Sequence, residues 1–300
     1  MTRVESTPGL LKRWILAARP RTLGAALAPV WVGSALALTQ GQAHPGVFAA
    51  ALLGALLIQV GTNFANDYFD FVNGADTETR IGPTRATQAG WMTPQQVRNA
   101  FILTFGLVAL PGAYLAWIGG LPILILGILS VLSGILYTGG PFPLGYKGLG
   151  DLFVLLFFGF GATLGTYWLH THSISQAAVL ASLAPGLLAT AILVVNNLRD
   201  HQTDALAGKR TLAVRFGVKF VRAEYLLCLV LGTLAPLWVY LFTPVKHPAS
   251  LLACGVLFAA RKPLQAVFSL DADPRLNPVL GQTNRLLLIH SLLFSAGLML

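Results

Sequence analysis

Long apolar segments recur along almost the whole 300-residue chain, and short stretches holding most of its charged residues separate them. Charged residues make up only 10% of the sequence, whereas hydrophobic residues make up 55%. A soluble globular domain would contain roughly 25% charged residues. Because a spanning helix needs about 20 apolar residues, a chain of this length can hold roughly eight to ten spans with short loops. We therefore predict an all-α membrane protein, with residues 1–300 forming a single transmembrane domain in contact with the lipid bilayer.

Clusters of Gly, Pro and charged residues mark the boundaries of about nine predicted transmembrane helices. They lie near residues 22–39, 46–66, 99–118, 121–138, 151–169, 176–196, 224–243, 249–267 and 284–300. Arg261 and Lys262 interrupt the eighth segment. We expect that helix to be broken, or to let these two side chains snorkel toward the membrane surface.

The basic residues fall almost entirely on one side of this predicted topology. Of the 20 Lys and Arg residues, only Lys246 lies in a connection that follows an odd-numbered span. The positive-inside rule therefore predicts a cytoplasmic N-terminus and an inner bacterial membrane protein whose charged face points to the cytoplasm. The net charge of +9 does not indicate a nucleic-acid partner, because the basic residues are scattered between apolar segments.

Two polar stripes end the second and the sixth predicted spans. In each stripe, Asn residues are followed by Asp residues at helical spacing. The first stripe holds Asn63, Asp67 and Asp70, and the second holds Asn196, Asp200 and Asp204; Asn66 and Asn197 lie in the same two segments and are further candidates for substrate binding. Since both stripes end an even-numbered span, they share one side of the membrane. This repetition suggests one bundle of two similar four-helix halves plus a terminal helix.

The carboxylates of the two stripes predict a magnesium site. Several Asp side chains converging at membrane depth would repel one another and would be costly to desolvate, unless hard cations lie between them. Magnesium prefers oxygen ligands and keeps waters and phosphate oxygens in its shell. The predicted metal ligands and catalytic acids are Asp67, Asp70, Asp200 and Asp204. Each Asp taken alone could simply end a helix in water, but the repeated stripe favours the metal site.

Basic residues beside the stripes predict a polyanionic substrate such as a diphosphate. Arg85 lies in the long loop after the first stripe, and Lys209 and Arg210 follow the second. Arg suits bidentate phosphate contacts and Lys acts as a point charge. The alternative is that these residues serve only as topology signals.

The loop of residues 137–151 is rich in Gly and Pro and carries a single cation, Lys147. Such a backbone can be rigid and still approach a ligand closely. We therefore predict that Tyr137, Tyr146 and a catalytic Lys147 lie next to the substrate. The alternative is a plain turn between two helices.

These motifs resemble those of the UbiA superfamily of intramembrane aromatic prenyltransferases over nearly the whole chain. The superfamily pairs an Asn-Asp-x-x-Asp segment with an Asp-x-x-x-Asp segment, which correspond here to residues 66–70 and 200–204. The resemblance implies that the carboxylates bind magnesium on an isoprenyl diphosphate, and that Arg19 lies near this diphosphate. Gly74 stands where 4-hydroxybenzoate relatives often have a third Asp, so Asp76, two residues later, is the corresponding candidate for substrate binding.

Within the superfamily, residues 66–76, 137–146, 196–200 and 208–213 resemble the 1,4-dihydroxy-2-naphthoate branch. This resemblance implies transfer of a polyprenyl or phytyl group to 1,4-dihydroxy-2-naphthoate with loss of carbon dioxide, which gives a menaquinone or phylloquinone precursor. Lys147 would then hold either the acceptor carboxylate or the diphosphate. The prenyl chain length and the oligomeric state stay open.

Three alternatives to this function remain at the level of sequence. The acceptor could be another aromatic acid such as 4-hydroxybenzoate or homogentisate. A cation-coupled transporter would also carry intramembrane carboxylates and internal repeats, but its charges would lie near the bilayer midplane rather than at one face. An assembly protein of a quinone complex would bind neither magnesium nor diphosphate.

Overall fold

The computed structural model describes residues 8–75 and 81–300, and these residues form helices joined by turns and short loops, without a β-strand. Most elements are α-helices; η1, η3 and η4 are 3-10 helices and η2 is a π-helix. In chain order they are α1 (Leu10–Ala18), η1 (Pro20–Thr22), α2 (Gly24–Leu38), α3 (Pro45–Val72), α4 (Pro94–Gly119), α5 (Leu121–Leu136), α6 (Gly150–Val154), η2 (Leu155–Gly161), α7 (Ala162–Thr171), α8 (Gln176–Leu206), α9 (Leu212–Thr233), α10 (Ala235–Phe242), η3 (Pro248–Gly255), α11 (Val256–Ala259), α12 (Arg261–Ser269), η4 (Pro274–Leu276) and α13 (Asn277–Met299).

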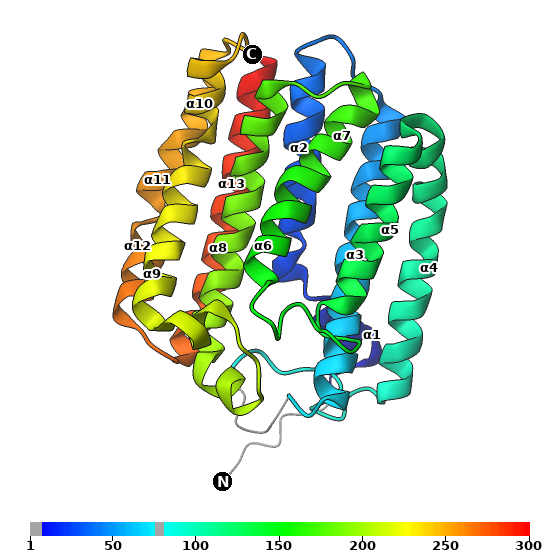
Figure 1. Cartoon of the computed structure of the whole chain (residues 1–300), viewed down its shortest axis with the longest axis vertical. Helices are drawn as coiled ribbons and strands as arrows, with labels where there is room; N and C mark the ends of the chain where they lie inside the picture. Colours follow the sequence, from blue (N-terminus) through cyan, green and yellow to red (C-terminus); the bar gives the residue numbers. More distant parts are fainter. Residues whose placement is uncertain (1–7, 76–80) are drawn as a thin grey trace.

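The long helices form one bundle (Figure 1). Helices α3, α4 and α5 pack together on one side, and α8, α9 and α13 pack together on the other. Helix α2 lies between the two groups and contacts α3, α7, α8 and α13. The carboxyl ends of α3 and α8 lie at the same end of the bundle, where α1 also lies (Figure 1). The fold therefore brings the two predicted polar stripes to one end.

The outer surface of the bundle is apolar, whereas its interior is built largely from small residues. Trp117 and Phe258 are 89% and 87% exposed, while Ala28, Ala178 and Ala184 are fully buried. Small residues allow helices to approach closely where lipid covers the outside. By length and composition, five helices in the described part of the chain can cross a membrane, or up to seven if each bent pair forms one span. The chain is an integral membrane protein.

The predicted spans coincide with helices or with consecutive helices of the structure. The segment 151–169 corresponds to α6, η2 and α7, and the segment 224–243 corresponds to α9 and α10, which are bent by 45°. The predicted spans 121–138 and 284–300 correspond to α5 and α13. The interrupted eighth segment consists of the 3-10 helix η3, the short helix α11 and the helix α12, which begins at Arg261.

The π-helix η2 packs directly against α8. A Cβ atom built on Gly159 would lie 2.9 Å from the Cα atom of Gly186, so glycine alone permits this contact. Isolated π-helical turns occur frequently at functional sites. Here the widened turn carries Phe157 and Phe158 along the wall of the cavity described below.

Candidate active site

A cavity of about 850 Å³ lies inside the bundle. One part of its wall is polar and comes from the ends of α3 and α8 with the segments that follow them, from the α1–η1 turn and from the segment 137–151. The polar wall residues include Arg19, Asn63, Asn66, Asp70, Arg85, Tyr137, Tyr146, Asp151, Asn196, Asn197, Asp200, Asp204 and Lys209. The rest is mainly apolar and includes Val108, Leu124, Ile128, Leu132 and Phe157. The cavity can therefore accommodate a molecule with one charged end and a long apolar end.

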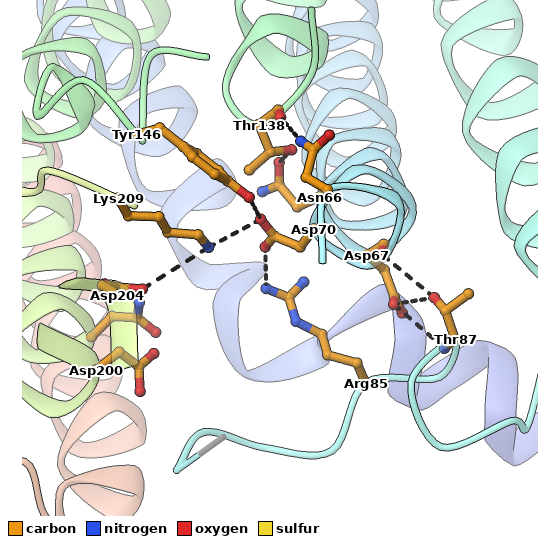
Figure 2. A network of polar contacts seen from close by, with 12 residues as sticks. Asn66, Asp67, Asp70, Arg85, Thr87, Thr138, Tyr146, Asp200, Asp204 and Lys209 are labelled. Carbon is orange, nitrogen blue, oxygen red and sulfur yellow. Dashed lines mark hydrogen bonds and ion pairs between the residues drawn. The ribbon is translucent and has the colours of Figure 1, made fainter. Parts of the chain in front are cut away.

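Asp70 is the centre of the polar contacts on the α3 side (Figure 2). Its carboxylate is 2% exposed and accepts hydrogen bonds from Arg85 Nη2 at 2.7 Å and from Tyr146 Oη at 2.8 Å. Lys209 Nζ donates to the same carboxylate at 3.0 Å. Asp70 thus pairs with two basic side chains at the wall of the cavity.

Lys209 joins the two acidic stripes. Its Nζ atom lies 3.0 Å from Asp70 Oδ1 and 4.0 Å from Asp204 Oδ1, and it sits 4.7 Å from the centre of the Tyr146 ring. The side chains of Lys209 and Asp204 are each only 13% exposed. This contact shows that the ends of α3 and α8 face each other across the polar end of the cavity, as Figure 2 illustrates.

A buried arginine holds Asp200 in place on the α8 side. Arg199 is fully buried, and its Nε and Nη2 atoms donate to the two oxygens of Asp200 at 2.7 and 2.5 Å. The same guanidinium donates to Asn196 Oδ1 at 2.8 Å and to Asn277 Oδ1 at 2.9 Å. Arg199 and Asn277 were not among the site residues predicted from the sequence. Asn277 comes from the start of α13, so no local spacing could have connected it to Asp200.

Asp67 faces away from the other carboxylates. It accepts hydrogen bonds from the backbone N–H of Ala86 at 3.2 Å, from the backbone N–H of Thr87 at 3.4 Å and from the Thr87 hydroxyl. Asp67 is 1% exposed and does not line the cavity, and Figure 2 shows its carboxylate turned toward Thr87. In this structure the Asp67 carboxylate thus binds residues 86 and 87, next to the Arg85 that contacts Asp70. Metal binding by Asp67 stays a prediction.

Asn63 and Asn66, in the carboxyl-terminal part of α3, connect this helix to neighbouring segments. Asn63 Nδ2 donates to Ala18 O at 2.9 Å and to Thr22 Oγ1 at 3.2 Å, which ties the α1–η1 turn to α3. Arg19 lies in that turn with φ 53°, a left-handed conformation that is uncommon for a non-glycine residue, and it lines the cavity. Asn66 Oδ1 accepts a hydrogen bond from Thr138 Oγ1 at 2.9 Å.

Besides Asp67, two further predicted site residues lie outside the cavity. Lys147 is exposed, its Nζ atom lies 5.3 Å from the centre of the Phe142 ring, and it is absent from the cavity wall. The side chain of Arg210 is exposed, while its backbone N–H donates to Tyr146 O at 2.8 Å. The structure thus puts Lys209, and not Lys147, beside the acidic residues. Asp76 lies outside the described residues.

The arrangement of oxygen ligands fits magnesium if phosphate supplies part of its shell. Within residues 8–75 and 81–300, no three His, Cys, Asp or Glu side chains come together closely enough to bind an ion by themselves. Magnesium, however, commonly binds through one or two carboxylates plus waters and substrate phosphates. Asp70 with Asn66 on α3, and Asp200 with Asp204 on α8, provide such ligands on two sides of the cavity.

The fold and the site together define an integral membrane protein that combines a charged pocket and an apolar cavity inside one helical bundle. A sequence profile of the UbiA prenyltransferase family matches residues 26–275. The chain belongs to the UbiA prenyltransferase family, as the resemblance of its motifs predicted.

Two relatives and one solved structure are similar to the chain over nearly its whole length. It is 40% identical over 298 residues to the 1,4-dihydroxy-2-naphthoate octaprenyltransferase of Haemophilus influenzae, which covers 97% of this chain and 96% of that protein. It is also 40% identical over 298 residues to the enzyme of the same name from Escherichia coli, with 96% and 95% coverage. The UbiA homolog from Archaeoglobus fulgidus, solved bound to GPP and Mg2+, shares 14% identity and a TM-score of 0.67 over 96% of this chain and 100% of that one.

Proposed function

We propose that this protein transfers an isoprenyl group from a polyprenyl diphosphate to 1,4-dihydroxy-2-naphthoate, with loss of carbon dioxide, in a magnesium-dependent reaction. One observation carries the proposal: a polar pocket of paired Asp, Arg and Lys side chains opens into an apolar cavity of about 850 Å³. The relatives named 1,4-dihydroxy-2-naphthoate octaprenyltransferase, at 40% identity over nearly the full chain, support the acceptor.

In this proposal some residues of the pocket bind the metal and others bind the diphosphate. Asn66, Asp70, Asp200 and Asp204 would hold magnesium, which when bound withdraws negative charge from the diphosphate. Arg19, Arg85 and Lys209 would donate to the diphosphate oxygens as the carbon–oxygen bond to the allylic carbon weakens. Lys147, predicted as a catalytic residue, and Arg210, predicted to bind substrate, have no role in this proposal, because neither residue lines the cavity.

The apolar wall would hold the prenyl chain and exclude water from the developing allylic cation. The electron-rich naphthoate ring then attacks this carbon, and the departing carboxyl group restores the aromatic ring. Positioning both reactants in one cavity replaces an encounter of two molecules by an intramolecular step. A hydrophobic product can leave into the lipid that surrounds the bundle.

We also propose that the bundle spans the membrane nine times, with the pocket facing the cytoplasm of a bacterial cell. Helices α5 and α13 would add two spans to the seven that length and composition allow when bent pairs are joined. The basic residues near the ends of α3 and α8 support the orientation, since the positive-inside rule retains such loops in the cytoplasm.

A product assay tests the function. Detergent-solubilised protein is incubated with magnesium, radiolabelled geranyl or octaprenyl diphosphate, and a panel of 1,4-dihydroxy-2-naphthoate, 4-hydroxybenzoate and homogentisate. We expect a prenylated, decarboxylated product from the naphthoate alone, and no product when EDTA removes the metal. A prenylated product from another acid would show that this acid, and not the naphthoate, is the acceptor. Release of diphosphate without transfer to any acid would refute the proposal.

A further inference from the structure

Asp151 is a buried carboxylate in the cavity wall that the proposed reaction has not yet used. It lies in the first turn of α6, is 5% exposed and lines the cavity. Its Oδ2 atom lies 3.5 Å from Asn197 Nδ2, and its Oδ1 atom has no hydrogen-bond partner in the described part of the chain. One carboxylate oxygen is thus buried at the cavity wall without a donor.

A purely structural role accounts poorly for this placement. An Asp in the first turn of a helix interacts favourably with the helix dipole, but a solvent-exposed side chain would do this equally well. Buried polar groups are almost always hydrogen-bonded, and a buried acceptor without a donor destabilises the folded protein. Because this unpartnered carboxylate belongs to a residue in the wall of a ligand cavity, we expect a bound ligand to supply the missing donor.

The chemistry of the ligand follows from the charge of Asp151. No Lys, Arg or His of the described residues forms an ion pair with it, in contrast to Asp70, Asp200 and Asp204. An unpaired carboxylate repels a diphosphate and repels the carboxylate of an aromatic acid. It attracts a hydroxyl donor, and the hydroxyl groups of the acceptor are the donors that the proposed substrates offer.

The neighbourhood of Asp151 is built to hold an aromatic hydroxyl. The Tyr137 hydroxyl packs against the adjacent backbone, because a Cβ atom on Gly150 would lie only 2.7 Å from Tyr137 Oη. Tyr137, Asn197 and Asp151 all line the cavity, and Phe153 and Phe157 on the same segment line it too. The cavity wall thus carries both polar groups and aromatic rings on Asp151 and the residues named with it.

We propose that Asp151 is a catalytic residue that accepts the proton of the acceptor hydroxyl next to the attacked ring carbon, with Asn197 positioning its carboxylate. This inference rests on the proposed function. As the ring carbon forms its bond to the allylic carbon and the bond to diphosphate breaks, the hydroxyl proton moves to Asp151 and the oxygen becomes a carbonyl. When the carboxyl group leaves as carbon dioxide, its bonding electron pair restores the ring and Asp151 returns the proton. No proton is gained or lost overall.

The test compares Asp151→Asn with Asp273→Asn, which makes the same chemical change outside the cavity. Asp273 is a suitable control because hydrogen bonds from Arg275 lower its pKa and keep it ionised. Both variants and the unmodified protein are assayed with 1,4-dihydroxy-2-naphthoate and with its 1-O-methyl ether, which has no proton on the oxygen next to the attacked ring carbon. We expect Asp151→Asn to lower kcat for the dihydroxy acid by at least about a hundredfold, the usual range for a general base. On the methyl ether, Asp151→Asn and the control should give rates within about threefold of each other.

Binding of geranyl diphosphate with magnesium, measured by thermal shift, separates catalysis from folding. It should be unchanged in Asp151→Asn, and Asp151→Glu should recover part of the lost rate because it restores the base. The proposal is overturned if Asp151→Asn matches the control on the dihydroxy acid, if its deficit persists on the methyl ether, or if both Asp151 variants lose geranyl diphosphate binding. If the unmodified protein prenylates a different hydroxy acid, the proposed acceptor fails, and the same comparison with that acid still decides the role of Asp151.

Discussion

Asp67 and Asp70 are only three positions apart, yet the structure predicts different consequences for the same substitution at each. Asp70 lines the cavity and contacts Arg85 and Lys209, so Asp70→Asn removes a ligand charge from the metal and diphosphate site. Asp67 instead accepts three hydrogen bonds from residues 86 and 87. Asp67→Asn therefore changes the support of the loop and leaves the proposed metal ligands in place.

The expected magnitudes separate the two roles. Asp70→Asn should reduce kcat by at least about a hundredfold, because about 1.4 kcal/mol of lost transition-state stabilisation corresponds to each factor of ten. It should also raise the magnesium concentration for half-maximal rate by about tenfold or more. Asp67→Asn replaces one acceptor oxygen by an NH2 group that faces donors. The lost charge-assisted hydrogen bonds should destabilise the protein by about 1.5–3 kcal/mol, with a modest fall in rate.

The assay is a magnesium titration of product formation, run beside a thermal unfolding scan for each variant. We expect Asp67→Asn to lower Tm by several degrees and to leave the half-saturating magnesium concentration within about threefold of the unmodified protein. Thr87→Val, which removes the hydroxyl donor to Asp67, should lower Tm in the same direction. The reasoning would be refuted if Asp67→Asn changed the magnesium requirement as strongly as Asp70→Asn does.

Three further predictions follow from the positions of single side chains. Lys147→Ala should keep kcat and both KM values within about threefold. Lys209→Ala should lower kcat/KM for the prenyl diphosphate by about 10- to 150-fold, as expected for the loss of a charge-assisted bond. Equal effects of the two variants in the product assay would contradict this assignment. Gly112→Leu should shift the preferred substrate toward shorter prenyl diphosphates, because Gly112 lines the cavity and a Cβ atom there meets no atom within 4 Å; an unchanged product-length distribution would show that the chain does not pass Gly112. Thr93→Ala should destabilise the protein by about 1 kcal/mol in thermal unfolding, because the capping box between Thr93 and Gln96 begins α4.

The helical framework could be predicted from the sequence because lipid imposes simple rules on composition and length. Each predicted span coincides with a helix or with consecutive helices, from α2 to α13. The two Asn/Asp stripes were also predictable, since helical spacing requires no knowledge of other segments. Their meeting at one end of the cavity follows from both spans ending on the same side of the membrane.

Assigning roles inside the site required contacts that are distant in sequence. Spacing puts Asp67 and Asp70 on one broad helix face, but only the path of residues 85–87 shows that Asp67 is used by the loop. Lys147 appeared important because it is the sole cation of its loop, yet that loop directs it toward Phe142. Arg199 fits the positive-inside pattern so well that its buried ion pair with Asp200 left no separate signal in the sequence.

The ion pairs at the polar end of the cavity have a consequence for the order of binding. In the structure, Asp70 is paired with Arg85 and Lys209, Asp204 also lies near Lys209, and Asp200 is paired with Arg199, so three carboxylates balance three cations. If magnesium bound without diphosphate, its positive charge would lie beside the buried Lys and Arg side chains. If diphosphate bound without magnesium, its negative charge would lie beside the buried carboxylates. Both events are unfavourable in a low-dielectric interior. When the two arrive together, magnesium can take the carboxylates while Lys209 and Arg85 turn to the diphosphate, and the balance is kept. Each ligand must therefore strengthen the binding of the other by the same factor, because the coupling free energy between two sites is reciprocal.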